Sequence, residues 1–142
     1  LKEESRQVEI DRVSRSAEAL LQSEEDAVIY TSRSLLTAGY AEGDLSISRH
    51  VSDALIKTIQ RITAKPRFIV AKGGITASDV ATKGLHVRRA LVLGQILPGV
   101  PVWRLGPESR HAGIPYVVFP GNVGGDDALA ETVKALRPPN KK

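Results

Sequence analysis

Two segments of this 142-residue chain share one order of features: a short apolar run, a glycine-rich turn and the start of a helical pattern. The first extends from Ile69 to Thr76 and the second from Val118 to Asp126. Apolar runs bounded by such turns are typical of buried strands, and alternation of strands with helices is typical of α/β domains. This order, found twice, therefore predicts an α/β fold in which glycine-rich loops follow the carboxyl ends of strands.

The spacing of apolar residues along the chain predicts the remaining elements. Expected helices lie at about 1–21, 47–62, 76–84 and 126–136, and expected strands at 27–30, 68–71, 91–93, 100–105 and 116–119, with a loop at 36–46. The last three strands are separated by Gly and Pro turns rather than by helices, which favours antiparallel pairing. We therefore expect a three-layer arrangement, with helices on the faces of a mixed parallel and antiparallel sheet. The first helix has no strand before it, so we expect that the sheet lacks its first strand.

Composition excludes several classes of site and partner. The chain has no Cys, which removes disulfides, thiolate metal ligands and cysteine nucleophiles, and its three His residues are scattered, so no metal site is predicted. The net charge is +4, but aromatic residues make up only 4%, too few for the stacking platforms that bind single-stranded nucleic acid. No apolar run approaches the roughly 20 residues of a membrane span. We expect neither a nucleic acid nor a membrane partner.

Glycine-rich turns at strand ends are suited to binding anions. Glycine lets the backbone approach a ligand closely, and the first-turn N–H groups of a helix direct partial positive charge outward. Neither loop matches the P-loop or the dinucleotide fingerprint, so a phosphate site here would be of another kind. Lys72, beside the first loop, either neutralises a phosphate or is simply solvated. Asp126 and Asp127 either hold Mg²⁺ through phosphate or cap a helix, and capping is the simpler explanation.

Three other features leave their alternatives open. Thr76 with Asp79 fits a capping box, and Gly84 is suited to the end of that helix. The segment 31–33 either faces the same crevice as the two loops or is a polar loop start. The segment 106–110 resembles a β-turn, and a ligand contact by its Glu and Arg is not required by the spacing.

Three motifs in this order carry a resemblance to a known family. They are Gly73-Gly74-Ile75-Thr76, Gly94-Gln95-Ile96-Leu97-Pro98-Gly99-Val100-Pro101 and Phe119-Pro120-Gly121-Asn122-Val123-Gly124. Together they resemble the C-terminal, nucleotide-binding domain of the four-carbon acid sugar kinases. The similarity is strong from about Phe68 to Leu136 and looser from Leu1 to Lys65.

The resemblance implies ATP-dependent phosphorylation of tetronate-like acids such as threonate, erythronate or their oxo relatives, with Mg²⁺ bridging the phosphates. By position, the nucleotide would be bound by Gly73, Gly74, Ile75 and Thr76 and by Gly121, Asn122 and Gly124. The segment 98–101 would shape the crevice more than contact the ligand. The catalytic residue is not assigned, because the group that accepts the sugar hydroxyl's proton is expected on a separate acid-sugar domain.

The resemblance also implies an organisation. Residues 1–137 would be an N-terminally truncated nucleotide-binding domain, followed by a basic tail at 138–142. Its partner would be the acid-sugar domain of the same full-length, cytoplasmic protein, so this part alone is expected to be inactive. The alternative is a non-catalytic nucleotide-sensing or docking module. A bare sheet edge would also permit a homo-oligomer.

Overall fold

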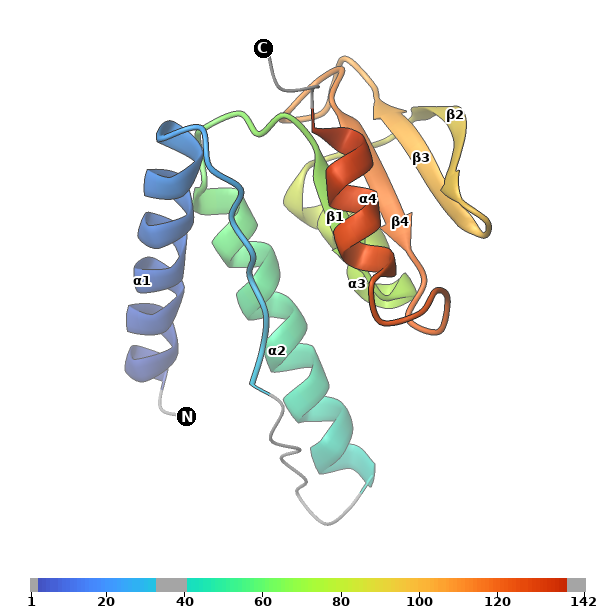
Figure 1. Ribbon diagram of the computed structural model, residues 1–142. Helices are drawn as coiled ribbons and strands as arrows, with labels where there is room; N and C mark the ends of the chain where they lie inside the picture. The colour runs from blue at the N-terminus through green and yellow to red at the C-terminus, as the bar shows by residue number, and fades with distance from the viewer. Residues whose placement is uncertain (1–2, 33–40, 138–142) are drawn as a thin grey trace. The chain divides into compact units, whose positions relative to one another are not determined.

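The computed structural model describes residues 3–32 and 41–137, with the backbone alone for 41–45 (Figure 1). The chain divides into two compact units, Leu1–Lys65 and Pro66–Lys142. The described part of the first unit contains α1 (Glu3–Gln22) and α2 (Ala41–Arg61). The second contains β1 (Ile69–Lys72), α3 (Gly74–Asp79), the π-helical turn η1 (Val80–Gly84), β2 (Ala90–Leu97), β3 (Val100–Leu105), β4 (Pro115–Phe119) and α4 (Ala128–Leu136). No described helix is both long enough and apolar enough to cross a membrane.

The first unit is a pair of packed helices. Its core includes Ile10 and Ala17 of α1 and Ile56 of α2, all buried. The buried Ser14 hydroxyl donates to the carbonyl of Ile10 at 2.6 Å, and it lies 3.4 Å from the carbonyl of Thr58 on α2. The apolar spacing thus predicted both helices. Of the residues in the two predicted stripes, Ile10, Ala17 and Ile62 are buried, whereas Leu20 and Val51 are 37% and 41% exposed.

Two expectations for the first unit are wrong. The apolar run 27–30 forms no strand, and Val28 and Tyr30 are 75% and 83% exposed. A strand is held by ladder bonds to a neighbour, and no strand of the described sheet pairs with this run. The expected loop at 36–46 is helical from residue 41 onward, because α2 begins before its apolar stripe does; residues 36–40 lie outside the described part.

The second unit is built on a four-stranded mixed sheet with the order β1-β4-β3-β2. β1 pairs with β4 in parallel, while β3 pairs with both β4 and β2 in antiparallel fashion. The predicted α/β class and the mixed sheet are confirmed. β2 is an outer strand, and Leu91, Val92 and Leu93 along it are 60%, 66% and 45% exposed.

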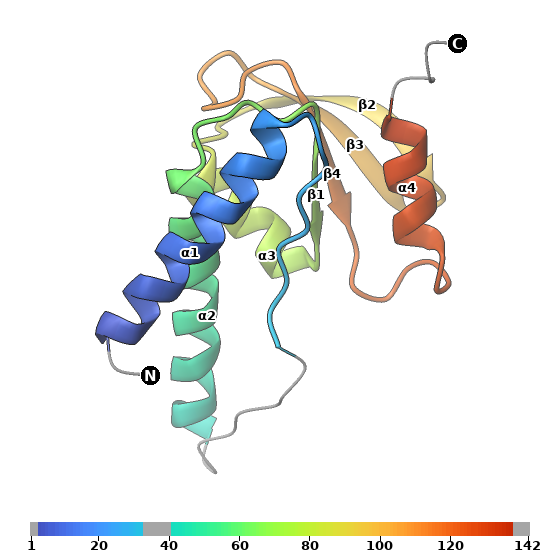
Figure 2. The same cartoon turned by 60° about the vertical axis from the view of Figure 1, so that its left-hand side comes forward.

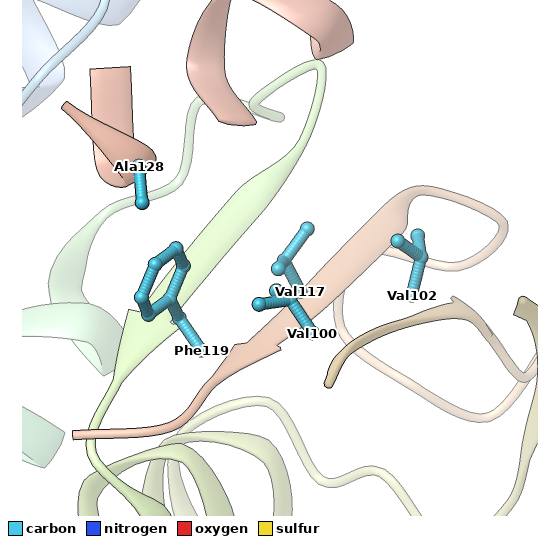
Figure 3. Close-up of a cluster of buried hydrophobic side chains, with 5 residues drawn as sticks. All are labelled: Val100, Val102, Val117, Phe119 and Ala128. Carbon is cyan, nitrogen blue, oxygen red and sulfur yellow. The ribbon is translucent and has the colours of Figure 1, made fainter. Parts of the chain in front are cut away.

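Alternate residues of β4 anchor the two faces of the sheet. The hydroxyl of Tyr116 donates to the carbonyl of Ala77 in α3 at 2.6 Å. Val117 and Phe119 instead belong to the buried cluster that includes Ala128 of α4 (Figure 3). Because side chains alternate along a strand, α3 and α4 cover opposite faces, and the strands lie between them in Figure 2. The second unit therefore has the expected three layers.

Candidate functional site

The two glycine-rich loops lie next to each other at the carboxyl ends of two neighbouring strands. They follow β1 and β4, which are parallel neighbours with Lys72 in register with Phe119 (Figure 1). Directly beyond this pair, the N–H of Gly73 donates to the carbonyl of Phe119 at 2.8 Å. Segments that are more than forty residues apart in sequence are thereby joined at the carboxyl ends of their strands, where open α/β sheets bind ligands.

The first loop is a turn made by one glycine. Gly73 is the N-cap of α3 and has φ 100° and ψ 133°, a conformation that side chains disfavour. The helix therefore begins at Gly74, two residues earlier than Thr76, and the predicted capping box at Thr76 is wrong. Ile75 is 82% exposed at the start of the helix. The first-turn N–H groups of α3 are consequently those of Gly74, Ile75 and Thr76, which are residues of the predicted site.

The second loop, residues 120–127, is longer and rests on side chains of the core. Gly124 has φ 82°, and a Cβ added there would lie 2.4 Å from the Cβ of Ala128. Val123 is half-buried and packs against the core cluster that contains Phe119. Gly121 and Asn122 are exposed. Within residues 121–127, Val123 alone is partly buried, and the others are exposed.

The segment 98–101 supports this second loop. A Cβ added at Gly99, which has φ 78°, would lie 3.6 Å from Cγ1 of Val123. The N–H of Gly99 donates to Oε1 of Gln95 at 2.7 Å, which fixes the turn between β2 and β3. The structure therefore places Gly99 against Val123, and the expected role of this segment in shaping a crevice stays a prediction.

Three glycines in the loops have no structural requirement for glycine. Gly74, Gly121 and Gly125 lie outside the positive-φ region, and a Cβ added to any of them would meet no heavy atom within 4 Å. The fold itself would accept a side chain at each position. Gly125 was not among the predicted site residues, although it lies in the same glycine-rich run. The absence of side chains leaves the backbone of both loops accessible to a ligand.

Lys72 joins the two loops. Its Nζ lies 3.4 Å from the carbonyl oxygen of Pro120 and 3.3 Å from that of Gly121. The same Nζ lies 4.7 Å from the centroid of the Phe119 ring, within the range of a cation–π interaction. The side chain therefore lies across the second loop, which the sequence alone did not indicate.

Two carboxylates, Asp126 and Asp127, lie at the end of the second loop, directly before α4. Asp127 occupies the N-cap position, but its side chain makes no capping hydrogen bond. Both Asp126 and Asp127 are exposed. The simpler explanation in the sequence, capping by a side chain, is therefore wrong for Asp127. In the part of the chain that the structure describes, no group of three or more His, Asp or Glu is arranged to hold a metal ion.

The turn at 106–110 is held by hydrogen bonds within the turn and to residues 88 and 89. The N–H and the hydroxyl of Ser109 donate to the carbonyl of Gly106, at 3.1 and 2.7 Å. Glu108 accepts from the N–H groups of Arg88 and Arg89 at 3.2 and 2.9 Å. Backbone hydrogen bonds, those to Arg88 and Arg89 among them, lower the pKa of Glu108 against the opposing effect of desolvation. The β-turn prediction is confirmed.

Other singled-out residues lie away from the loops or outside the described part. Thr31 and Ser32 are exposed in a segment without secondary structure, and residue 33 is not described. Two surface hollows, of about 380 and 340 Å³, are lined by other residues: Asp11, Ser14, Arg15, Glu18, Arg61 and Thr63 in the first unit, and Thr82, His86, Arg88 and Glu108 in the second. The residues of the two glycine-rich loops line neither of these two hollows.

Comparison with protein families gives the identity of the domain. Residues 1–129 match the model of the family described as the nucleotide-binding C-terminal domain. The chain belongs to this family. The match includes both units and both glycine-rich loops up to the first residues of α4. Nucleotide binding is thus the property of the family, and the adjacent loops are the candidate site for it in this domain.

Solved structures agree with the fold of this nucleotide-binding C-terminal domain. Two crystal forms of a Bordetella bronchiseptica protein, described as a domain of unknown function (DUF1537) with bound citrate and as a domain-swapped dimer, are each 24% identical to it. Their TM-scores are 0.58 and 0.61, and they cover 83% and 87% of this chain. The matched part is only 28% and 30% of the Bordetella chain in the two crystal forms. A comparison with curated proteins gave no match.

Proposed function

We propose that this domain is the ATP-binding part of a cytoplasmic kinase that phosphorylates four-carbon acid sugars of the threonate, erythronate or oxo-tetronate type. The observation that carries the proposal is the set of glycines that the fold does not require, Gly74, Gly121 and Gly125, in the two adjacent loops. Membership of the nucleotide-binding family supports a nucleotide as the ligand. The motifs that resemble acid sugar kinases support the substrate class.

In this proposal the backbone binds the phosphates. The first-turn N–H groups of α3, from Gly74, Ile75 and Thr76, point partial positive charge toward the open edge. Gly73 fixes the turn that aims them, and its own N–H is used by the carbonyl of Phe119. Gly121 and Asn122, which are both exposed in the second loop, would also contribute. Gly124 would shape that loop, because any side chain there would collide with Ala128.

Two carboxylates at the end of the second loop are suited to hold a divalent cation together with the phosphates of the nucleotide. Mg²⁺ is usually held by one or two carboxylates together with phosphate oxygens and water. Asp126 and Asp127 are exposed carboxylates at the end of the second loop, and the Asp127 side chain is not used for capping. These two residues would hold Mg²⁺ once the nucleotide is bound. ATP supplies the transferred phosphoryl group, and the role of this domain is positioning and charge stabilisation.

The acid-sugar site would lie in another domain of the full-length protein. The matched Bordetella chains are more than three times as long as the shared part, and they hold citrate, a hydroxylated carboxylic acid. A small acid as substrate agrees with this chemistry. The domain alone is therefore expected to bind nucleotide without turnover, and no residue of it is assigned as catalytic.

Titration calorimetry with Mg·ATP tests the nucleotide site. We expect Gly121→Trp and Gly74→Val to weaken binding at least tenfold, since each side chain would fill space that the ligand needs and its Cβ would have no heavy atom within 4 Å. Ala135→Trp, on an exposed position at the far end of α4, is the matched control and should bind as the unmodified chain does. Unchanged affinity in both loop variants, or no binding by the unmodified chain, would refute the proposed site.

The alternative, a non-catalytic nucleotide-sensing or docking module, predicts no phosphoryl transfer even when an intact acid-sugar domain is present. A phosphorylation assay of the full-length protein with threonate and erythronate separates the two. Product formation that Gly121→Trp abolishes supports the kinase, and nucleotide binding without product from any four-carbon acid supports the module.

A homo-oligomer is proposed on separate grounds. The outer strand β2 exposes Leu91 and Val92, and exposed apolar residues on an edge strand favour pairing with another chain. The Bordetella protein is described as a domain-swapped dimer in both crystal forms. Analytical ultracentrifugation should show a dimer that Val92→Lys shifts toward monomer, whereas a monomer at all concentrations would exclude the proposal.

A further inference from the structure

Lys72 is the one basic residue in the two loops, 72–76 and 120–127. It ends β1, and its exposed side chain extends over the Phe119 ring to the second loop. Phe119 itself is 1% exposed, so the ring under the lysine is a fixed part of the core. The ammonium is thus held at the junction between the loops by a rigid support and does not extend freely into solvent.

The contacts of the ammonium leave it able to bind another acceptor. A lysine ammonium has three N–H donors. The two carbonyl oxygens, of Pro120 and Gly121, lie at 3.4 and 3.3 Å, longer than the usual N–H···O distance of about 2.9 Å. Neutral carbonyls at such distances compensate a positive charge only weakly. An anion beside Gly121 would meet a charge-assisted donor that is already in place.

We propose that Lys72 binds the phosphate chain of the nucleotide and selects for nucleotides by their charge. This inference rests on the proposed nucleotide site and assigns it a residue that contacts the phosphates. When the ligand is absent, the same ammonium holds the second loop to the end of β1 through Pro120 and Gly121. A phosphate oxygen would take over the ammonium while the backbone of Gly121 stays close to the ligand.

The proposal is tested by comparing ligands that differ only in phosphate. Titration calorimetry of the unmodified chain, Lys72→Met and Lys72→Arg with Mg·ATP and with adenosine gives the ratio of the two affinities. Methionine keeps the aliphatic length of the side chain over Phe119 and removes the charge. We expect Lys72→Met to lose about tenfold to a hundredfold in Mg·ATP affinity, the size of one hydrogen bond to a charged group, with adenosine affinity unchanged. Lys72→Arg should retain most of the ATP affinity.

The control is Lys134→Met, which removes the same charge from an exposed position in the last turn of α4. Its ATP affinity should match that of the unmodified chain, because general electrostatic attraction is small at physiological salt. Equal losses for ATP and adenosine in Lys72→Met would show that Lys72 only positions the loop and would overturn the inference. ATP binding that Lys72→Met leaves unchanged would overturn it while leaving the proposed nucleotide site intact. Failure of the unmodified chain to bind either ligand would overturn both.

Discussion

The two loops leave the same edge of the sheet, yet they obtain their shapes in different ways. The first turns within one residue, where the backbone of Gly73 adopts φ 100°. The second uses eight residues and takes its shape from packing, with Gly124 against Ala128 and Val123 against the core. In one loop glycine is needed for its dihedral angles, and in the other mainly for its missing Cβ. The glycines left over, Gly74, Gly121 and Gly125, are the ones that a ligand would explain.

Gly124→Ala should have the largest effect on stability. The new Cβ would lie 2.4 Å from the Cβ of Ala128, and the residue would also keep φ 82°. Overpacking and a left-handed conformation together cost about 3–4 kcal/mol. Urea unfolding followed by the fluorescence of Trp103, the single tryptophan, measures it. The double variant with Ala128→Gly should recover part of the loss, and no recovery would contradict the packing explanation.

Gly73→Ala should destabilise the second unit by about 2 kcal/mol, because φ 100° with ψ 133° is a region that is almost restricted to glycine. Here no steric neighbour is involved, since the nearest side-chain atom to an added Cβ is 3.8 Å away. A second-site change should therefore give no rescue, in contrast to Gly124. Gly74→Ala is the matched control in the same loop and should change the unfolding free energy by less than about 0.5 kcal/mol.

Tyr116→Phe tests the support of the first loop, because the buried hydroxyl ties β4 to α3 at Ala77. Loss of one buried hydrogen bond should cost about 1–2 kcal/mol at neutral pH. Burial also raises the pKa of Tyr116 above its ordinary value of 10.0. The folded chain therefore holds this proton while the unfolded chain releases it, so the stabilisation is complete below pH 10 and is lost as the pH rises further.

The unmodified chain should accordingly lose stability more steeply above pH 10 than Tyr116→Phe does. Tyr30→Phe, at a tyrosine that is 83% exposed, is the control and should keep the steep alkaline loss. Parallel curves for Tyr116→Phe and the unmodified chain would contradict this assignment.

Val123→Ala should have the smallest effect, about 1 kcal/mol, because Val123 is only half-buried against the turn at Gly99. Val123→Ala should affect nucleotide binding more than it affects stability, because the second loop would lose a packing contact while the first loop stays intact. Weakened Mg·ATP binding with an unfolding free energy lowered by only about 1 kcal/mol is the expected pattern. An unfolding loss as large as that of Gly124→Ala would show that the loop is supported in another way.

The sequence predicted the parts of the fold that periodicity and turns determine locally. The helices α1 and α4, the strands of the sheet and the antiparallel hairpin at 90–105 follow from the apolar pattern and from Pro98 and Gly99. The prediction from sequence failed where tertiary contacts determine whether a segment forms a strand. The apolar run 27–30 looks like a buried strand, but its state depends on whether a neighbour pairs with it.

The sequence likewise predicted only the part of the candidate site that local patterns determine. Glycine-rich turns after two strands indicated both loops, and their parallel strands place them together. The local sequence does not indicate that Lys72 lies over Phe119. Nor does it indicate that Ala128 lies too close to residue 124 for any side chain other than that of glycine. Both depend on which side of the sheet a residue faces and on what lies across from it, which only the packed structure determines.

The parallel pairing of β1 with β4 also bears on how this unit folds. The hairpin of β2 and β3 and the next pairing of β3 with β4 join residues that are near in sequence, whereas β1 meets β4 only after a long loop has closed. Closing distant segments is entropically costly and slow. We therefore expect the antiparallel strands to form early and the two glycine-rich loops to meet late. In kinetic refolding experiments, recovery of nucleotide binding should lag behind formation of the Trp103 environment.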